Sequence, residues 1–207
     1  MSISKSKPSV LKHADGEFYT RYFAKAYDTL TTLSGWKRHI MPAAFLDLPK
    51  GRLLDVGCGT GDVLNEALLR GYNATGIDAS EGMVQKAKTR HGLDDQQIKV
   101  SLADDLPFAD QSFDAGIASG SLVHIPQIQG AVKEIHRVLK PGGIMRILDH
   151  AVPVQKSITT PIFWAFSHAS GDILHDYKHY FENGFELVDH KTIARGGYLQ
   201  KFDFKKI

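Results

Sequence analysis

The chain of 207 residues is poor in cysteine and has no long apolar run. Its single cysteine, Cys58, cannot form an internal disulfide, and its place in a glycine-rich stretch suits a small filler better than a nucleophile. No stretch of about 18 consecutive apolar residues is present, and Met1 to Ser9 are polar, without the apolar centre of a secretory signal. We therefore expect a cytoplasmic protein that touches a membrane at its surface at most.

The sequence also lacks a large excess of either positive or negative charge. The 25 Lys and Arg residues and the 23 Asp and Glu residues are interspersed and leave a net charge of +2. No footprint for a polyanion is visible, so we expect no nucleic-acid partner. A hydrophobic content of 43% in 207 residues is enough for one substantial core and short for two ordinary domains, which favours a single domain.

What the sequence has is an apolar run that passes into a glycine turn at residues 52–61. The run is typical of a buried parallel strand, and residues 63–69 then begin a helix. Gly57, Gly59 and Gly61 carry no Cβ atom, so a ligand can lie directly against the backbone of the turn. A purely structural turn or a dinucleotide-binding oxidoreductase would have a similar glycine pattern, so the turn alone does not identify the ligand.

Strands and helices alternate beyond this turn. The pattern predicts strands at 73–77, 98–102, 113–118 and 143–149, and helices at 62–70, 80–91 and 128–139. Such alternation indicates a parallel sheet covered on both faces. Pro42 and Pro49 should bracket a short helical linker before the first strand.

The last third of the chain differs. Residues 153–182 are predicted to be helical and are rich in aromatics, while 185–193 and 198–204 are predicted to be two strands joined at Arg195-Gly-Gly197, a hairpin signal. The aromatic side chains from Ile162 to Phe166, with Tyr177, Tyr180 and Phe181, are either a cover over a substrate or plain core.

Four further segments stand at workable distances from the glycine turn. They are residues 72–78, which end in Asp78, 102–108 (Leu-Ala-Asp-Asp-Leu-Pro-Phe), 112–119 and 137–143. With them, residues 19 to about 150 resemble the class I S-adenosylmethionine-dependent methyltransferases, of the methyltransferase-11 type that includes the ubiquinone/menaquinone biosynthesis C-methyltransferases. A nicotinamide-dependent dehydrogenase is disfavoured, because the third glycine is not at the Gly-x-Gly-x-x-Gly spacing.

The resemblance implies a fold and a division of the chain. The fold is an α/β, Rossmann-like, doubly wound, seven-stranded sheet with an antiparallel terminal hairpin. One methyltransferase domain would span 1–207, with a helical lid at 1–49, a cofactor-binding core at 50–150, and a substrate cover with the hairpin at 151–207.

The resemblance also implies S-adenosylmethionine as the cofactor, lying against backbone groups of Gly57, Cys58 and Gly59. Asp78 ends the second strand about 20 residues later, where a carboxylate can accept both hydroxyls of a ribose. Asp55 either faces the ammonium group of the ligand or only holds the loop.

Other cofactor contacts follow from the resemblance alone. Ala79 and Met83 would line the adenine pocket, and Ser119 would border the cofactor. Tyr19 and Tyr27 belong to the lid segment and would border the methionine part, with packing in the core as the alternative.

The contact to the adenine amino group is less direct. Relatives often carry Asp or Asn where this sequence has Leu102. Either Asp104 or the backbone of Ala103 would then make this contact.

Catalysis by methyl displacement depends mainly on holding the acceptor in line behind the methyl group, and a base is needed only where the acceptor loses a proton. His124 and His150 follow the fourth and fifth strands, at the sheet edge where doubly wound folds place their sites, so both are candidate catalytic residues; a structural histidine is the alternative. His175 and His179 stand four residues apart, as metal ligands on a helix would, but the displacement needs no metal and we predict none.

The acceptor is predicted to be small and apolar or amphipathic: a quinone precursor, a lipid head group or a small metabolite. The absence of an Asn-Pro-Pro-Tyr tetrapeptide after the fourth strand argues against the methyltransferases of exocyclic amines in DNA and of protein glutamine. The alternative function is a non-catalytic protein that binds S-adenosylmethionine for regulation.

Overall fold

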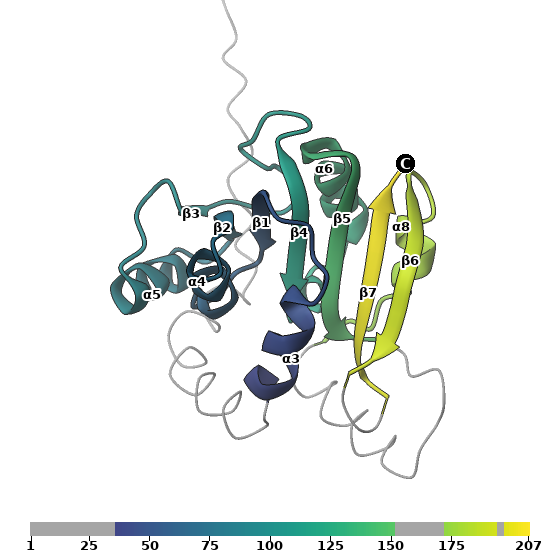
Figure 1. Cartoon of the computed structure of the whole chain (residues 1–207), viewed down its shortest axis with the longest axis horizontal. Coiled ribbons are helices and arrows are strands. Elements are labelled where there is room, and N and C mark those ends of the chain that lie inside the picture. The colour runs from purple at the N-terminus through teal and green to yellow at the C-terminus, as the bar shows by residue number, and fades with distance from the viewer. Residues whose placement is uncertain (1–35, 152–171, 194–196) are drawn as a thin grey trace, which may run out of the picture.

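The computed structural model describes residues 36–151, 172–193 and 197–207 (Figure 1). They form one seven-stranded sheet in the order β3-β2-β1-β4-β5-β7-β6. The strands are β1 (Arg52–Val56), β2 (Asn73–Asp78), β3 (Ile98–Val100), β4 (Phe113–Ser119), β5 (Leu139–His150), β6 (Phe185–Thr192) and β7 (Leu199–Lys206). The helices are α3 (Trp36–Phe45), α4 (Asp62–Leu69), α5 (Glu81–His91), the 3-10 turn η2 (Leu122–His124), α6 (Ile128–Val138) and α8 (Tyr177–Phe181).

The first five strands run parallel, and β7 lies antiparallel between β5 and β6. The strand order reverses between β1 and β4, so the connections on either side of this point lead away in opposite directions, and doubly wound folds bind their ligands at the carboxyl edge beside such a point. The predicted doubly wound sheet with an antiparallel terminal hairpin is confirmed.

Two apolar cores cover the two faces of the sheet. Leu53 lies in one core with α3, α4 and α5, and its neighbour Leu54 lies in the other with α6 and α8. Figure 1 shows α3 in front of β4 and β5 and α6 behind them. Burial on both faces explains why the parallel strands read as nearly continuous apolar runs.

Local signals set several helix ends. Ser80 caps α5, because its Oγ accepts a hydrogen bond from the amide of Met83 (3.3 Å), and Gly92 ends the helix at a φ of 69°. Gly71, with a φ of 81°, follows α4 and donates its amide to the carbonyl of Leu68 (2.9 Å). These ends agree with the predicted helices.

Other boundaries differ from the prediction. Pro42 lies inside α3 instead of bracketing a linker, and the apolar contacts of Ile40, Ala44 and Phe45 in the core hold the helix through it. The third strand ends early at Val100, which is half exposed, and β5 begins at Leu139 because its first residue pairs with Phe113 before an irregularity.

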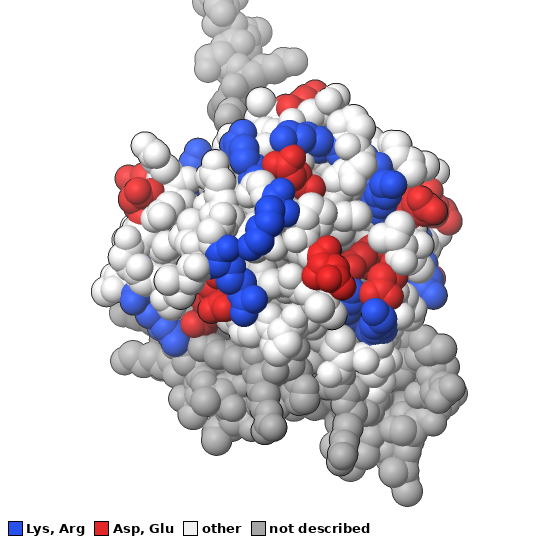
Figure 2. Space-filling view, viewed as in Figure 1, with Lys and Arg blue, Asp and Glu red and all other residues white. Residues whose placement is uncertain are grey.

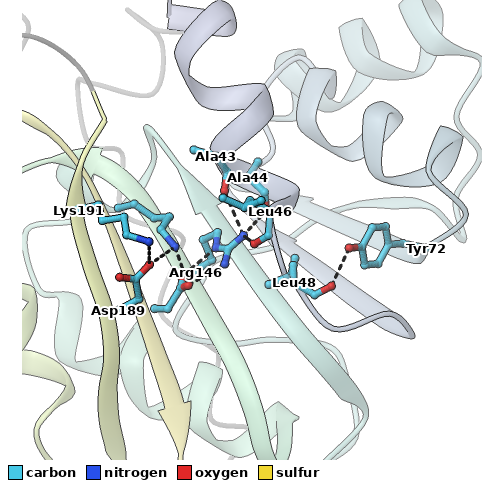
Figure 3. A network of polar contacts seen from close by, with 10 residues as sticks. Ala43, Ala44, Leu46, Leu48, Tyr72, Arg146, Asp189 and Lys191 are labelled. Atoms are coloured by element: carbon cyan, nitrogen blue, oxygen red, sulfur yellow. Dashed lines mark hydrogen bonds and ion pairs between the residues drawn. The ribbon is translucent and has the colours of Figure 1, made fainter.

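A buried polar network joins α3 to the terminal hairpin (Figure 3). Arg146 on β5 is only 2% exposed and donates to both carboxylate oxygens of Asp203 on β7 (2.7 Å each). Its third nitrogen, Nη1, donates to the carbonyls of Ala43 (3.1 Å), Ala44 (3.1 Å) and Leu46 (2.7 Å), where α3 ends. The guanidinium therefore satisfies helix carbonyls that have no partner within the helix.

Lysines extend this network along the hairpin. The ammonium of Lys201 lies between Asp203 (2.8 Å) and Asp189 (2.6 Å), and Lys191 also contacts Asp189 (3.1 Å) (Figure 3). Each buried charge in the network thus has an opposite charge beside it.

The surface seen in Figure 2 carries interspersed basic and acidic side chains, as the balanced composition predicts. Within the described ranges, no helix is both long and apolar enough to cross a bilayer.

Candidate functional site

The predicted site residues meet at the carboxyl edge of the sheet. Val56 at the end of β1 is paired with Ile77 on one side and with Ala118 on the other. One strand further, Ser119 is paired with Leu148 of β5. The glycine turn, Asp78, Ser119 and His150 therefore follow neighbouring strand ends at the point where the strand order reverses.

The glycine turn is fixed by backbone hydrogen bonds. The amides of Gly57 and Cys58 both donate to the carbonyl of Ile77 (2.8 and 2.9 Å). Gly57 has a φ of 70°, and a Cβ at this position would lie 2.4 Å from the Cβ of Ser121. Gly57 is therefore required by the packing of the turn against the loop after β4.

Gly59 has a different surrounding. Its φ is 53°, and a Cβ there would meet no atom of the described residues within 4 Å. Open space beside a backbone that lacks a side chain is what a close-fitting ligand needs. The turn thus offers its backbone to a ligand at Gly59.

Asp78 ties the turn to the start of α5. One carboxylate oxygen accepts from the amide of Gly59 (2.8 Å) and the other from the amide of Ser80 (2.9 Å). Burial raises the pKa of this carboxyl, and the two amides oppose the rise. An ionised carboxylate accepts about four hydrogen bonds, so Asp78 keeps capacity for two ribose hydroxyls.

Asp55 is a buried acid at the carboxyl end of β1. It is 1% exposed, and its Oδ2 has no hydrogen-bond partner among the described residues. Burial, reinforced by the charge of Asp78, raises its pKa from 3.8 to about 7, against a hydrogen bond from the backbone of Leu64. A buried carboxyl oxygen without a donor is a suitable acceptor for a ligand ammonium, and the bond to Leu64 shows that the same group also holds the loop.

Cys58 takes part through its backbone. Its side chain is buried in the core that contains Leu64, and its sulfur fills the space over Gly76, where a Cβ would come within 2.8 Å. Burial also raises the thiol pKa well above its ordinary value, so the thiol is a poor nucleophile.

The residues proposed around the adenine follow Asp78. Ala79 is exposed at the start of α5, and Met83 is buried in its first turn. The segment after β3 starts beside them, because the amide of Ser101 donates to the carbonyl of Asp78 (3.0 Å). In that segment Ala103 packs against the core, while Asp104 is exposed and lies over Gly130 of α6.

Ser119 ends β4, and its Oγ is buried without a hydrogen-bond partner in the part of the chain that the structure describes. A buried hydroxyl without a partner at this edge is a polar group that a ligand could satisfy. Tyr19 and Tyr27 lie outside the described residues.

The two histidines lie together and share an acid. His150 Nδ1 is 2.9 Å from Oδ2 of Asp172, and His124 Nδ1 is 3.9 Å from Oδ1 of the same residue. Burial lowers the pKa of His124; His150 adds to this effect, and Asp172 opposes it. Both histidines are candidates from their places after strands, but no periodic signal in the sequence indicates that Asp172, 22 residues beyond His150, would join them.

Asp149 at the end of β5 is hydrogen-bonded to the residues around His124. It is fully buried and accepts from the amides of Leu122 (3.1 Å) and Val123 (3.3 Å) and from the hydroxyl of Tyr177 (3.2 Å). Burial raises its pKa to about 6. Asp149 therefore holds η2, and with it His124, against the end of β5.

The aromatic and histidine candidates within the described residues have structural partners, and residues 162–166 lie outside that part of the chain. Tyr177 and Phe181 are almost fully buried in the core, so for these two residues the core interpretation holds. His175 is buried with its Nε2 against the carbonyl of Ile125 (3.0 Å), whereas His179 is exposed and pairs with Glu182. Across the described ranges, no three His, Cys, Asp or Glu side chains are grouped to hold a metal ion.

Comparison with known proteins supports the resemblance. A family model described as a methyltransferase domain matches residues 54–147. The central part of the chain is therefore similar to this methyltransferase family. The match covers the glycine turn, Asp78 and Ser119, and it ends three residues before His150.

Two curated relatives are named as quinone methyltransferases. The chain is 38% identical over 133 residues to the demethylmenaquinone methyltransferase of Staphylococcus epidermidis, covering 62% of this chain and 52% of the relative. It is 36% identical over 166 residues to the ubiquinone/menaquinone biosynthesis C-methyltransferase of Geotalea daltonii, covering 76% and 61%. The chain thus spans between about half and three fifths of the length of these relatives.

A solved structure shows the same fold. The S-adenosylmethionine-dependent methyltransferase of Thermotoga maritima superposes with a TM-score of 0.73 at 19% identity, covering 92% of this chain and 99% of that one. The resemblance to the class I methyltransferases is confirmed by the family match and by the fold.

Proposed function

We propose that this protein is a methyltransferase that uses S-adenosylmethionine and transfers its methyl group to a small apolar or amphipathic acceptor. The observation that carries the proposal is the arrangement at the carboxyl edge: an open backbone at Gly59, the carboxylate of Asp78 beside it, and the unpaired buried oxygen of Asp55. The three features match the three polar parts of that cofactor, and the family match supports it.

In this proposal the residues of the chain bind the cofactor and orient the methyl acceptor. Asp78 accepts the ribose hydroxyls, the turn from Gly57 to Gly59 meets the amino-acid part with its backbone, and Asp55 accepts from the ammonium group. When bound, the cofactor supplies a methyl group on a positively charged sulfur. Residues at the ends of β4 and β5 then hold the acceptor in line, which converts the transfer into an intramolecular step.

Ala79, Met83, Ala103, Asp104 and Ser119 are proposed to complete the adenine and cofactor surroundings. The lid at 1–49, with Tyr19 and Tyr27, and the cover within 151–207 are proposed to exclude water from the transfer.

For the acceptor, we propose a quinone precursor. Its support is the printed function of the two relatives above, which both belong to quinone methylation. Lipid head groups and other small metabolites are the competing acceptors, to be compared in the same assay.

Isothermal titration with S-adenosylhomocysteine tests the cofactor site. We expect a 1:1 complex, and absence of binding at high micromolar ligand would remove the proposal. Methyl transfer is then measured with radiolabelled S-adenosylmethionine and reduced demethylmenaquinone. Binding without transfer to this acceptor or to a panel of lipids and phenols would favour a regulatory binding protein.

A further inference from the structure

We propose that Asp172 is a positioning residue that holds His150 as the proton acceptor for methyl transfer, so that the acceptor belongs to the class of hydroxyl-bearing aromatic compounds. This inference rests on the methyltransferase function proposed above and narrows its acceptor. Neither the family match, which ends at residue 147, nor the fold assigns the pair.

The hydrogen bond fixes which nitrogen of His150 carries the proton. Asp172 has a side chain only 5% exposed, and its Oδ2 is 2.9 Å from His150 Nδ1. An ionised carboxylate only accepts hydrogen bonds, so Nδ1 must be the donor. In neutral imidazole the proton on Nδ1 leaves the lone pair on Nε2, which is the form that accepts a proton.

Acidic side chains flank His150. Among the described residues, the titratable groups that face it are Asp149 on its own strand, Asp172, and His124 of η2, with Tyr177 of α8 bonded to Asp149. Gln200 and Leu199, the β7 residues paired with Asp149 and His150, carry no charge. A positive charge placed on the His150 ring by proton transfer therefore has two carboxyl groups beside it.

His150 lies at the same edge of the sheet as the cofactor cradle. β4 lies between β1 and β5, so at about 4.8 Å per strand His150 is roughly 10 Å across the sheet from the glycine turn. His150 also keeps a side chain 17% exposed, which gives the proton a route to solvent.

In the proposed reaction the acceptor loses one proton and gains one methyl group. His150 Nε2 takes the hydroxyl proton, and the bonding pair of the O–H bond stays on the acceptor as a phenolate. The phenolate oxygen, or the ring carbon conjugated with it, forms the new bond to the methyl carbon. The methyl–sulfur bond breaks with its electrons on sulfur, which neutralises the sulfonium. For a ring carbon, the proton on that carbon then moves to the oxygen, so one proton is lost in either case.

Kinetics test the pair. With reduced demethylmenaquinone as the probe, we expect Asp172→Asn and His150→Gln each to lower kcat by at least about 100-fold. The affinity for S-adenosylhomocysteine should stay within about twofold, because neither residue belongs to the cofactor cradle. Asp172→Glu should recover part of kcat, and the acidic limb of the kcat against pH profile should vanish in His150→Gln.

Two variants serve as matched controls. His179→Gln removes a histidine that is 67% exposed, and Asp95→Asn removes an acid that is 92% exposed; both should keep the wild-type kcat and pH profile. If Asp172→Asn also keeps them, the inference is wrong although the methyltransferase function stands.

A second measurement is independent of turnover and of the acceptor. Nitrogen-15 NMR of the His150 ring, recorded above the pH at which the ring signals stop changing, should show the Nδ1–H tautomer in the wild type. Asp172→Asn should shift the ring toward the other tautomer. An Nε2–H tautomer in the wild type refutes the inference, whereas absence of methyl transfer with the expected tautomer counts only against the proposed function.

Discussion

Replacing Arg146 by methionine tests how much the buried network stabilises the fold. The change keeps a long apolar stem but removes two hydrogen bonds to Asp203 and three to the carbonyls of Ala43, Ala44 and Leu46. Removal of one partner from a buried ion pair costs about 3–5 kcal/mol, chiefly because the other charge is left unpaired.

The structure places the loss at the lower end of that range. Asp203 keeps the ammonium of Lys201 at 2.8 Å, so its carboxylate does not become an isolated charge. We therefore expect Arg146→Met to lower the free energy of unfolding by about 3 kcal/mol, most of it from the three carbonyls without donors. At about 2–4 °C per kcal/mol for a chain of this size, the melting temperature should fall by roughly 6–12 °C.

Urea unfolding at neutral pH, followed by circular dichroism, measures this loss. Arg70→Met is the matched control, because Arg70 has a side chain 45% exposed and an ion pair to Glu66 that is worth at most about 1 kcal/mol. In the double variant Arg146→Met/Asp203→Leu, part of the loss should return, since the second change removes the weakened carboxylate. A loss of less than about 1 kcal/mol in Arg146→Met, equal to that of the control, would refute the reasoning.

Three further predictions concern the cofactor site. Asp78→Ala should weaken binding of S-adenosylhomocysteine by about 1–3 kcal/mol in calorimetry, because ribose hydroxyls lose a charged acceptor; unchanged affinity in a folded variant would place the cofactor elsewhere. Gly59→Val should abolish this binding, because a branched side chain would fill the space beside the open backbone; since a φ of 53° also strains valine, a melting curve must show that the variant is folded, and normal affinity would contradict the open cradle. The pKa of Asp55 is raised from 3.8 to about 7 in the folded state, so its contribution to stability is fully present below about pH 4 and is lost as pH rises to 7. Urea midpoints across this window should fall less steeply in Asp55→Asn than in the wild type, with a residual slope from Asp149, and parallel slopes would show that Asp55 is not buried as an acid.

The central part of the fold could be predicted because its signals are local. The apolar strands, the glycine turn and the Ser80 cap each depend on residues close together in the sequence, and the structure agrees with them. Pro42 was misread because a proline usually ends a helix, whereas here the core contacts of α3 outweigh that preference.

The polar networks could not be predicted because their partners are far apart. Arg146 and Asp203 are separated by 57 residues, and a charged residue between Met145 and Ile147 shows only that some partner must exist. In the same way His150 was a candidate from its place after a strand, but its link to Asp172 needs the structure. The sequence also does not show which residue of a short acidic or aromatic segment faces the site, because packing decides this. Tyr177 is buried in the core, and Asp104 lies against Gly130 of α6.

The hydrogen bonds from Arg146 to the end of α3 have a consequence for exchanging amino-terminal segments between related proteins. Arg146 contacts backbone carbonyls, which every residue type provides, and the next turn is held in the same manner, since the hydroxyl of Tyr72 donates to the carbonyl of Leu48 (3.0 Å). The hydrogen bonds themselves therefore do not depend on the side chains at 43, 44, 46 and 48, but Ala44, Phe45 and Leu48 are also buried in the core. Amino-terminal segments of related proteins can be exchanged at this stretch when they keep apolar side chains at 44, 45 and 48.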